Sequence, residues 1–127
     1  MLSNCIIVDN ELPALKVLQT YVESVPQLKI IMNCKSAFET IHALNTENID
    51  LIFLDIQMSK MIGTKFLKSL PHPPKVIFTT ASKDFAYEAW ELDAIDYLLK
   101  PISFQRFLRA INKFSKLDNI EKYSGKK

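Results

Sequence analysis

The 127-residue sequence has few cysteines and no long hydrophobic segment. Cys5 and Cys34 lack the spacing of a metal site, and each lies in an apolar, strand-like segment, so we expect two small buried thiols. No apolar stretch approaches the roughly 20 residues that a membrane span requires. The N-terminus also lacks the basic and long apolar regions of a signal peptide. We therefore expect a cytoplasmic protein with no membrane association.

Internal repeats and low-complexity segments are absent as well. The length suits one domain, and the hydrophobic content of 48% is enough to build a core, beside an ordinary charged fraction of 24%. The sequence predicts one globular domain over residues 1–118. Residues 119–127 are predicted to be a polar, basic tail or the start of a linker.

Charge is spread unevenly along the chain, although the net charge is only +2. From Lys100 to the end there are eight basic and two acidic residues, whereas the first 99 residues hold eight basic and twelve acidic ones. An acidic body therefore carries a basic C-terminal helix and tail. Contact with nucleic acid is one use for such a tail, but a solvated helix face explains the same pattern and is favoured.

Five short apolar segments alternate with five segments in which apolar residues recur at helical spacing. Strands are predicted at 5–8, 28–32, 51–54, 76–78 and 94–99, and helices at 13–24, 37–44, 64–69, 83–92 and from 104 onward. Alternating strands and helices predict an α/β fold with a parallel sheet, helices on both faces and right-handed crossovers. The segment between 55 and 64 is predicted to be a loop.

Several residues are predicted to start helices. Ser36 and Glu39 match a capping box, and Ser103 is a predicted N-cap for the last helix. That helix has a stripe of apolar residues predicted to face the core, which are Phe104, Phe107, Leu108, Ile111 and Phe114.

The segment 51–55 is the centre of the functional argument. Leu51, Ile52, Phe53 and Leu54 form an apolar run typical of a strand buried on both faces, and Asp55 follows at its carboxyl end. In open parallel sheets, ligands bind at the carboxyl ends of the strands. On this segment alone, Asp55 is equally well interpreted as a helix cap or as a reactive carboxylate.

Polar residues also follow the other predicted strands. Asp9, Asn10 and Glu11 follow the first strand, Thr80 ends the fourth, and Lys100 follows the fifth. Clustered carboxylates need a cation to stay ionised, and Mg²⁺ commonly uses one or two carboxylates together with phosphate oxygens. A hydroxyl and an ammonium opposite them would bind a phosphoryl group, which an aspartate can accept as an acyl phosphate.

These motifs together resemble a two-component response-regulator receiver domain over essentially the whole chain. The matching segments are Val8-Asp9, Phe53-Leu54-Asp55-Ile56-Gln57-Met58, Phe78-Thr79-Thr80-Ala81 and Tyr97-Leu98-Leu99-Lys100-Pro101. The stretch from Phe85 to Ile102 further resembles receivers joined to LytTR-type (LytR/AlgR) DNA-binding domains. The resemblance implies a single flavodoxin-like (βα)5 fold, a doubly wound five-stranded parallel sheet with strand order 2-1-3-4-5.

The resemblance assigns the phosphoacceptor and the metal ligands. Asp55 corresponds to the phosphoacceptor, and Asp9 to the first residue of an acidic pair that holds a metal-bound water. Mg²⁺ is implied as the cofactor, with Asp55, Asn10 and the backbone carbonyl of Gln57 as further ligands. Glu11 is adjacent, but strand alternation is expected to point it elsewhere.

The resemblance also assigns a switch. Thr80 corresponds to the hydroxyl that follows the phosphoryl group, and strand alternation favours it over Thr79. Lys100 corresponds to the lysine that pairs with the phosphate, and Pro101 to a proline preceded by a cis bond. Tyr97 corresponds to an aromatic residue whose rotamer changes on activation.

Two positions depart from the family pattern. Asn10 stands where a second Asp is usual, which removes one negative charge from the pocket, and Ser59 stands where Pro is favoured. Asn10 is the one argument for an alternative function, a phosphorylation-independent pseudo-receiver that acts as a protein-interaction module. An aspartate-nucleophile phosphatase is disfavoured, because such enzymes need a second acid where this chain has Gln57.

The favoured prediction is therefore a regulator that catalyses only its own phosphorylation and dephosphorylation. Its expected partner is a sensor histidine kinase. A homodimer is expected through the face formed by the fourth helix, the fifth strand and the last helix, and DNA contact only through an effector domain. Whether Phe85 and Trp90 on the fourth helix belong to the core or to a partner surface stays open.

Overall fold

The computed structural model of the chain describes residues 2–124, with side chains described through residue 118. The elements in chain order are β1 (Ser3–Val8), α1 (Leu12–Glu23), β2 (Leu28–Cys34), α2 (Ala37–Thr46), β3 (Leu51–Asp55), α3 (Ile56–Ile62), α4 (Thr64–Ser69), β4 (Lys75–Thr80), the 3₁₀ helix η1 (Lys83–Phe85), α5 (Ala86–Glu91), β5 (Asp96–Leu99) and α6 (Phe104–Ser124).

The strands form one parallel sheet in the order β2-β1-β3-β4-β5, which confirms the predicted fold class. β3 lies at the centre, with Val8 of β1 opposite Leu54 and Thr79 of β4 opposite Asp55. This register brings the carboxyl ends of β1, β3 and β4 to the same edge of the sheet. Residues that follow these strands are therefore neighbours in space although they are far apart in sequence.

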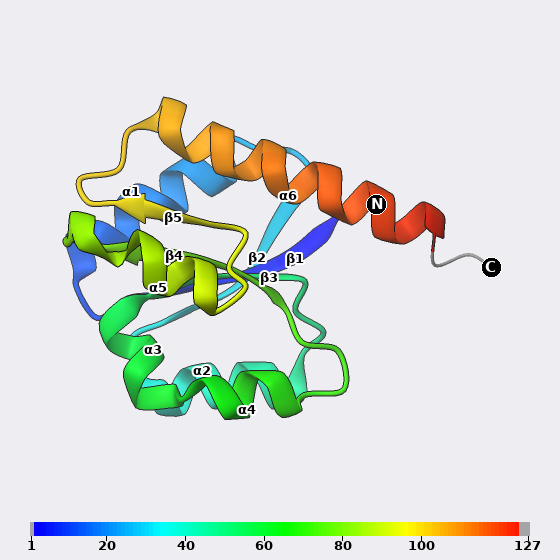
Figure 1. Cartoon of the computed structure of the whole chain (residues 1–127), viewed down its shortest axis with the longest axis horizontal. Coiled ribbons are helices and arrows are strands. Elements are labelled where there is room, and N and C mark those ends of the chain that lie inside the picture. Colours follow the sequence, from blue (N-terminus) through cyan, green and yellow to red (C-terminus); the bar gives the residue numbers. More distant parts are fainter. Residues whose placement is uncertain (1, 125–127) are drawn as a thin grey trace.

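Helices cover both faces of the sheet (Figure 1). One hydrophobic cluster joins the sheet to α1 and α6, and the other joins it to α2, α3, α4 and α5. β3 contributes to both clusters, because Leu51 and Phe53 point to one face and Ile52 and Leu54 to the other. All four are fully buried, and each such side chain contributes about 1.5–3 kcal/mol of hydrophobic stabilisation. The predicted two-sided burial of this strand is confirmed.

The predicted helix starts are confirmed with one change of detail. The Ser103 hydroxyl accepts a hydrogen bond from the Arg106 backbone N–H, and the Ser36 hydroxyl accepts one from the Glu39 N–H. The Glu39 carboxylate, however, accepts from the N–H of Lys35 at 2.7 Å. A standard capping box would direct it to the N–H of Ser36, so here the reciprocal bond is shifted by one residue.

The predicted loop after Asp55 is wrong, because α3 begins directly at Ile56. Asp55 is the N-cap of this helix, and its Oδ1 accepts a hydrogen bond from the Gln57 N–H at 2.7 Å. Met58 and Ile62, one turn apart, are buried against the sheet. The described part of the chain therefore has a helix on each side of Gly63, whose φ of 90° separates α3 from α4.

The core stripe of α6 is shifted from the predicted one. Phe107, Ile111 and Phe114 are buried as expected, but Phe104 and Leu108 are 39% and 36% exposed. Ala110 is buried in their place, because the stripe follows the line of contact with the sheet. The helix backbone continues without a break across residue 118 to Ser124, and the division of the chain at that point stays a prediction.

Both cysteines are buried free thiols, as predicted. Burial raises the pKa of Cys5 to about 12 and that of Cys34 to about 11, so neither is a thiolate at neutral pH. Within residues 2–124, the structure has no helix with the length and apolar character needed to cross a bilayer.

α5 ends in a backbone conformation that a non-glycine residue rarely adopts. Asp93 has a φ of 58°, and its N–H donates to the Trp90 carbonyl. The next residue, Ala94, donates to the Ala89 carbonyl at 3.1 Å. This position at the C-terminus of a helix is typical of glycine, because a Cβ is strained there.

We expect Asp93→Gly to raise the free energy of unfolding by about 0.5–1 kcal/mol, because glycine removes the steric cost of the left-handed conformation. Urea denaturation measures the change. Gly63→Ala is the matched control, since a Cβ at Gly63 would meet no atom within 4 Å and its effect comes from the backbone alone. The free energy of unfolding of Gly63→Ala should fall by about 1 kcal/mol, because alanine is strained at a positive φ. An unchanged urea midpoint in Asp93→Gly would show that Asp93 is unstrained.

Candidate functional site

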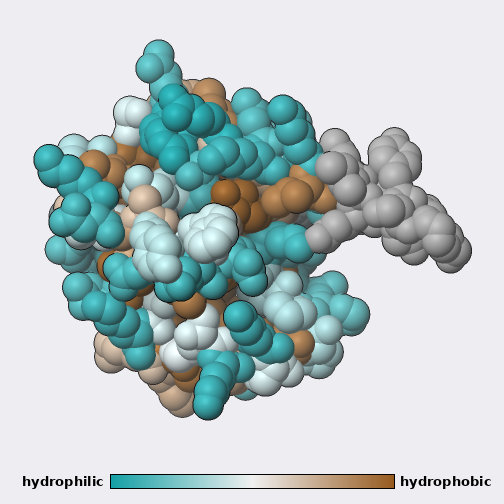
Figure 2. Space-filling model, viewed as in Figure 1, coloured by the Kyte–Doolittle hydropathy of each residue, from teal (hydrophilic) through white to brown (hydrophobic). Residues whose placement is uncertain are grey.

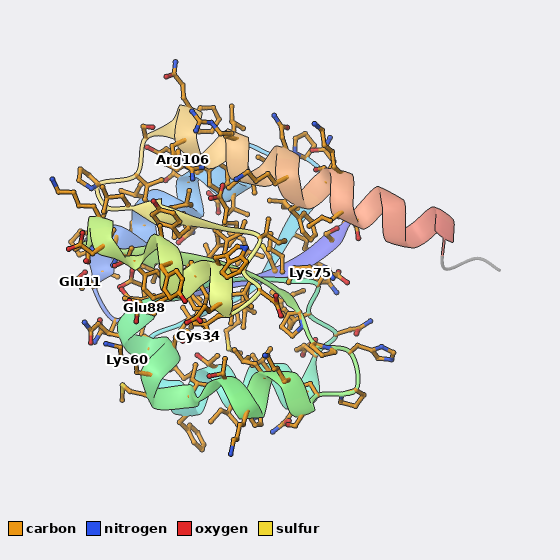
Figure 3. All side chains as sticks on the ribbon, viewed as in Figure 1. Glu11, Cys34, Lys60, Lys75, Glu88 and Arg106 are labelled. Carbon is orange, nitrogen blue, oxygen red and sulfur yellow. The ribbon has the colours of Figure 1, made fainter. Side chains whose placement is uncertain are left out.

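The polar residues predicted at the strand ends meet in a cleft at the carboxyl edge of the sheet. The cleft has a volume of about 850 Å³, and its lining includes Asn10, Glu11, Asp55, Thr80 and Lys100. Lys60 and Glu88 line the cleft as well. Figure 3 shows both residues and Glu11 on the side of the molecule where α3 and α5 begin. The register of β1, β3 and β4 explains this convergence, because their carboxyl ends are aligned.

Lys100 is the centre of the cluster. Its Nζ lies 2.7 Å from Asp55 Oδ2, 2.8 Å from Asp9 Oδ2 and 3.2 Å from Glu11 Oε1. The Lys100 and Asp55 side chains are largely buried, that of Asp9 is fully buried, and that of Glu11 is mostly exposed. One ammonium therefore faces three carboxylates, two of which are shielded from water.

The pKa of Lys100 reflects this setting. Burial alone would lower the pKa of the lysine, but the carboxylates of Asp55 and Asp9 outweigh burial and raise it above its ordinary value. Lys100 is thus fully charged at neutral pH. Its single positive charge is shared by three carboxylates, an arrangement that favours a further cation.

The carboxylates are oriented by the backbone around them. Asp55 Oδ1 accepts from the Gln57 N–H, and Asp9 Oδ1 accepts from the Glu11 N–H at 2.9 Å. The second oxygen of each carboxylate, Oδ2, faces Lys100. Both side chains are therefore held with one oxygen directed into the cluster.

The donor set suits a magnesium ion. Asp9, Glu11 and Asp55 each offer a carboxylate oxygen, and these oxygens lie within 4.8 Å of one another. Mg²⁺ prefers hard oxygen ligands and keeps several waters, which an open cleft allows. Asp9 and Asp55 were predicted as ligands, whereas Glu11 was expected to point elsewhere. The expectation that Glu11 points away was wrong, because it assumed that the strand continues. β1 ends at Val8, and the chain then turns into α1.

The two other predicted ligands are an amide and a backbone carbonyl, not carboxylates, and both residues line the same cleft. Asn10 is exposed on the lining of the cleft. Gln57 contacts Asp55 through its backbone N–H. It lies in the first turn of α3, where N–H groups point toward the N-cap and carbonyls point toward the following turn. The metal roles of Asn10 and of the Gln57 carbonyl stay predictions.

The predicted switch residues lie around the same cleft. Thr80 lines it, and its hydroxyl accepts a hydrogen bond from the Ser82 N–H at 3.0 Å. The Thr79 hydroxyl is buried and has no hydrogen-bond partner among the described residues. Tyr97 is partly buried against the cluster that includes α5. The Lys100–Pro101 peptide bond is cis, as the resemblance implied.

Sequence reasoning missed an ion pair that ties β5 to α6. Arg106 donates two hydrogen bonds to the Asp96 carboxylate, at 2.8 and 2.7 Å, and a third to the Tyr97 carbonyl. Lys113 Nζ lies 3.2 Å from Asp96 Oδ2. Burial by itself raises the pKa of Asp96, but Arg106 and the Tyr97 N–H outweigh it and lower the pKa. An acidic residue inside an otherwise apolar strand is the signal that would have revealed the pair.

We expect Arg106→Gln to lower the free energy of unfolding by about 1.5–3 kcal/mol, because Asp96 would keep its charge without its main partner. Lys113→Gln is the matched control. Half of the Lys113 side chain is exposed, so its loss should cost under about 1 kcal/mol. Urea denaturation at pH 7 measures both.

The effect of Arg106→Gln should depend on pH. Because the pKa of Asp96 is lowered in the folded state, its stabilisation is present above its unfolded pKa of about 3.9. It is lost as the pH falls through the folded value. The difference between wild type and Arg106→Gln should therefore shrink in acid. A difference that is the same at pH 7 and in acid would contradict the assignment to Asp96.

Residues 5–112 match the model of the response regulator receiver domain. The sensory transduction protein LytR of Staphylococcus haemolyticus is 38% identical over 111 residues, covering 85% of this chain and 43% of that protein. The transcriptional regulatory protein BtsR of Escherichia coli is 35% identical over 108 residues, covering 84% and 45%. The chain thus spans less than half the length of these curated relatives.

Solved structures with the same fold include close matches over nearly the whole chain. The response regulatory domain of mrkE from Klebsiella pneumoniae has a TM-score of 0.77 at 30% identity, covering 94% of this chain and 98% of that one. The receiver domain of a Luxo repressor protein from Vibrio parahaemolyticus has a TM-score of 0.82 at 19% identity, covering 98% of both chains. The second likeness concerns the fold alone.

Proposed function

The chain belongs to the response regulator receiver domain family of two-component systems, and on that premise we propose that Asp55 accepts a phosphoryl group from the phosphohistidine of a sensor kinase. The observation that carries this proposal is the 2.7 Å contact between Lys100 Nζ and Asp55 Oδ2 at the end of the central strand. A carboxylate held beside an ammonium at a cleft is positioned both to attack phosphorus and to have its product stabilised.

The proposed reaction is a transfer between two nucleophiles. An Asp55 oxygen bonds to phosphorus while the phosphorus–nitrogen bond of phosphohistidine breaks. The bonding electron pair stays on the imidazole, which takes up a proton from water. Lys100 pairs with the phosphoryl oxygens of the acyl phosphate. Such a domain catalyses its own phosphorylation and dephosphorylation only, and acts as a regulator in all other respects.

Receiver domains bind Mg²⁺ through acidic residues, and the acidic cluster of this chain fits that ion. We propose that Asp9 and Asp55 hold it, and the family pattern assigns further ligand positions to Asn10 and the Gln57 carbonyl. When bound, the ion neutralises charge that develops on the phosphoryl oxygens. The alternative of a phosphorylation-independent module rested on Asn10 alone. It is not favoured, because Asp9, Glu11 and Asp55 still supply carboxylates at the site.

The proposed switch runs from Thr80 to Tyr97. The Thr80 hydroxyl is an acceptor from the Ser82 N–H, so its own proton is available for a phosphoryl oxygen. Movement of Thr80 would open space for Tyr97, which is partly buried on β5. The face formed by α5, β5 and α6 would then change shape, which is how a local charge biases a two-state element.

We propose that the sensor kinase docks over an apolar groove beside the site. The groove has a volume of about 670 Å³ and lies between α1 and the segment before α6. Its lining includes Val17, Tyr21 and Ile102, and it opens next to Glu11 and Lys100. A helix of the kinase seated there would bring its phosphohistidine to Asp55. This proposal also places the protein in the cytoplasm, because the kinase domain acts there.

A homodimer through α5, β5 and α6 is the second proposed interaction. Trp90 and Tyr87 on α5 are 74% and 66% exposed, and their ring centroids are 6.3 Å apart. Pale and hydrophobic side chains lie over α5 and along the adjacent edge of α6, surrounded by hydrophilic ones (Figure 2). α5 carries exposed Glu88 and Glu91, whereas α6 carries exposed Arg109 and Lys116 two turns apart. Two copies related by a two-fold axis would pair these opposite charges.

The output of the domain is proposed from its relatives. LytR is named a sensory transduction protein and BtsR a transcriptional regulatory protein. We propose that residues 1–118 form the receiver and that residues 119–127 lead toward an effector domain of LytTR type, which would make any contact with DNA.

We expect Asp55→Asn to abolish labelling by a small phosphodonor in the presence of Mg²⁺, because an amide cannot form an acyl phosphate. Intact mass reads out the added phosphoryl group. Asp84→Asn is the matched control, since Asp84 lines the same cleft but belongs neither to the acidic cluster nor to the Lys100 ion pairs among the described residues. A labelled Asp55→Asn protein would show that the phosphoacceptor is another residue.

We expect Trp90→Ala to weaken self-association of the phosphorylated domain by about tenfold, since a central exposed aromatic dominates an interface of this kind. Sedimentation velocity with phosphodonor and Mg²⁺ measures the dimer fraction. Phe38→Ala on α2 is the control, because Phe38 is 80% exposed on an element outside the proposed face. Equal dimer fractions in wild type and Trp90→Ala would exclude α5 as the interface.

A further inference from the structure

We infer that Glu11 supplies the carboxylate that Asn10 cannot, and that it is a magnesium ligand of this chain. The inference rests on the proposed function, because it refines the metal site of the same cleft. The family pattern places an acidic pair after the first strand, and this chain has Asp9 followed by Asn10. The structure offers the missing charge one residue later.

The backbone after β1 places Glu11 over Asp9. The Glu11 N–H donates to Asp9 Oδ1 at 2.9 Å, which pins the turn. Glu11 is the N-cap of α1, yet its side chain makes no capping hydrogen bond within the described helix. The carboxylate is therefore not used to start the helix. It reaches back toward the cleft, where Oε1 lies 3.2 Å from Lys100 Nζ.

Asp9 provides an independent reason to expect a cation at this point. Its side chain is fully buried, and within the described residues Oδ2 accepts no hydrogen bond of good geometry. The contact of this oxygen with Lys100 Nζ at 2.8 Å is an ion pair. A buried carboxylate oxygen is costly unless a cation and hydrogen bonds compensate it, and Lys100 divides its one charge among three carboxylates.

The competing donors are less suited to this role. Asn10 is exposed, and its neutral amide oxygen attracts a divalent cation less than the Glu11 carboxylate does. The Gln57 carbonyl belongs to the first turn of α3, in which carbonyls point away from the N-cap. Among the described residues, the acidic oxygens that converge within 4.8 Å are those of Asp9, Glu11 and Asp55. Glu11 is also mostly exposed, so its side chain is free to adjust around an ion that keeps several waters.

Direct Mg²⁺ binding to the full chain, measured by isothermal titration calorimetry without any phosphodonor, tests this inference. Glu11→Gln keeps the shape of the side chain and removes its charge, and should weaken Mg²⁺ binding by about 10- to 100-fold. Asn10→Ala should weaken it far less. Asp84→Asn removes an acid from the same cleft but outside the cluster, and it controls for the general loss of negative charge. Thermal unfolding of each variant establishes that it is folded.

The same titration in an Asn10→Asp background tests whether Glu11 compensates for the acid that is missing at position 10. Asn10→Asp restores an acidic pair and should tighten Mg²⁺ binding. If Glu11 stands in for that acid, Glu11→Gln should cost less in the Asn10→Asp background than in the wild type. Equal costs in the two backgrounds would contradict compensation.

Other outcomes separate this inference from the proposed function. Unchanged Mg²⁺ affinity in Glu11→Gln, or a loss no larger than in Asp84→Asn, overturns the inference while leaving phosphorylation of Asp55 to be judged by intact mass. A loss in Asn10→Ala that exceeds the loss in Glu11→Gln assigns the ligand to Asn10 and also overturns it. Failure of the wild type to bind Mg²⁺ at millimolar concentration overturns both this inference and the proposed metal site.

Discussion

The charge balance between Lys100 and the carboxylates of Asp9 and Asp55 is the constraint on which the rest of the site depends. Each carboxylate belongs to a different strand end, and the lysine to a third. Burying two carboxylates side by side is unfavourable without a cation. The same two carboxylates raise the pKa of Lys100 above its ordinary value, although burial would lower it. The same arrangement leaves the site short of positive charge, and a phosphoryl group with its magnesium ion would redistribute that charge. The resting structure and the proposed chemistry therefore share one electrostatic cause.

β5 connects this cluster to the C-terminal helix. Lys100 follows the last residue of the strand, and Asp96 at its first residue binds Arg106 of α6 through two hydrogen bonds. Arg106 also holds the carbonyl of Tyr97, between these two points. Because close-packed interiors have low compressibility, a four-residue strand held at both ends is suited to carry the displacement that the proposed switch requires. The proposed switch residue, Tyr97, lies on β5 between Lys100 at the site and the Asp96–Arg106 contact with α6.

The carboxylates also differ in what fixes them. Asp55 is oriented by the first turn of α3, and Asp9 by the turn that leads into α1. Glu11 is fixed at its backbone by Asp9, and its mostly exposed carboxylate contacts Lys100 Nζ at 3.2 Å. Rigid ligands paired with one adjustable ligand suit a hard cation that exchanges readily, because part of its coordination comes from water. Under the proposed metal site, Glu11 would compensate for the departure at Asn10 without a change in the strands.

Much of the fold follows from local sequence alone. The apolar run before Asp55 specifies a strand buried on both faces, and the Ser103 hydroxyl specifies a helix start, because each depends on neighbours in the chain. Strand ends that carry Asp9, Asp55, Thr80 and Lys100 were enough to predict which residues meet, since parallel strands align their carboxyl ends. Tertiary structure decided the rest. α3 begins directly at Ile56, Glu11 turns into the cleft, and Asp96 pairs with Arg106, because each depends on how a turn or a helix packs against distant segments. The periodicity of apolar residues predicts single helices and strands, whereas these contacts form between separate elements.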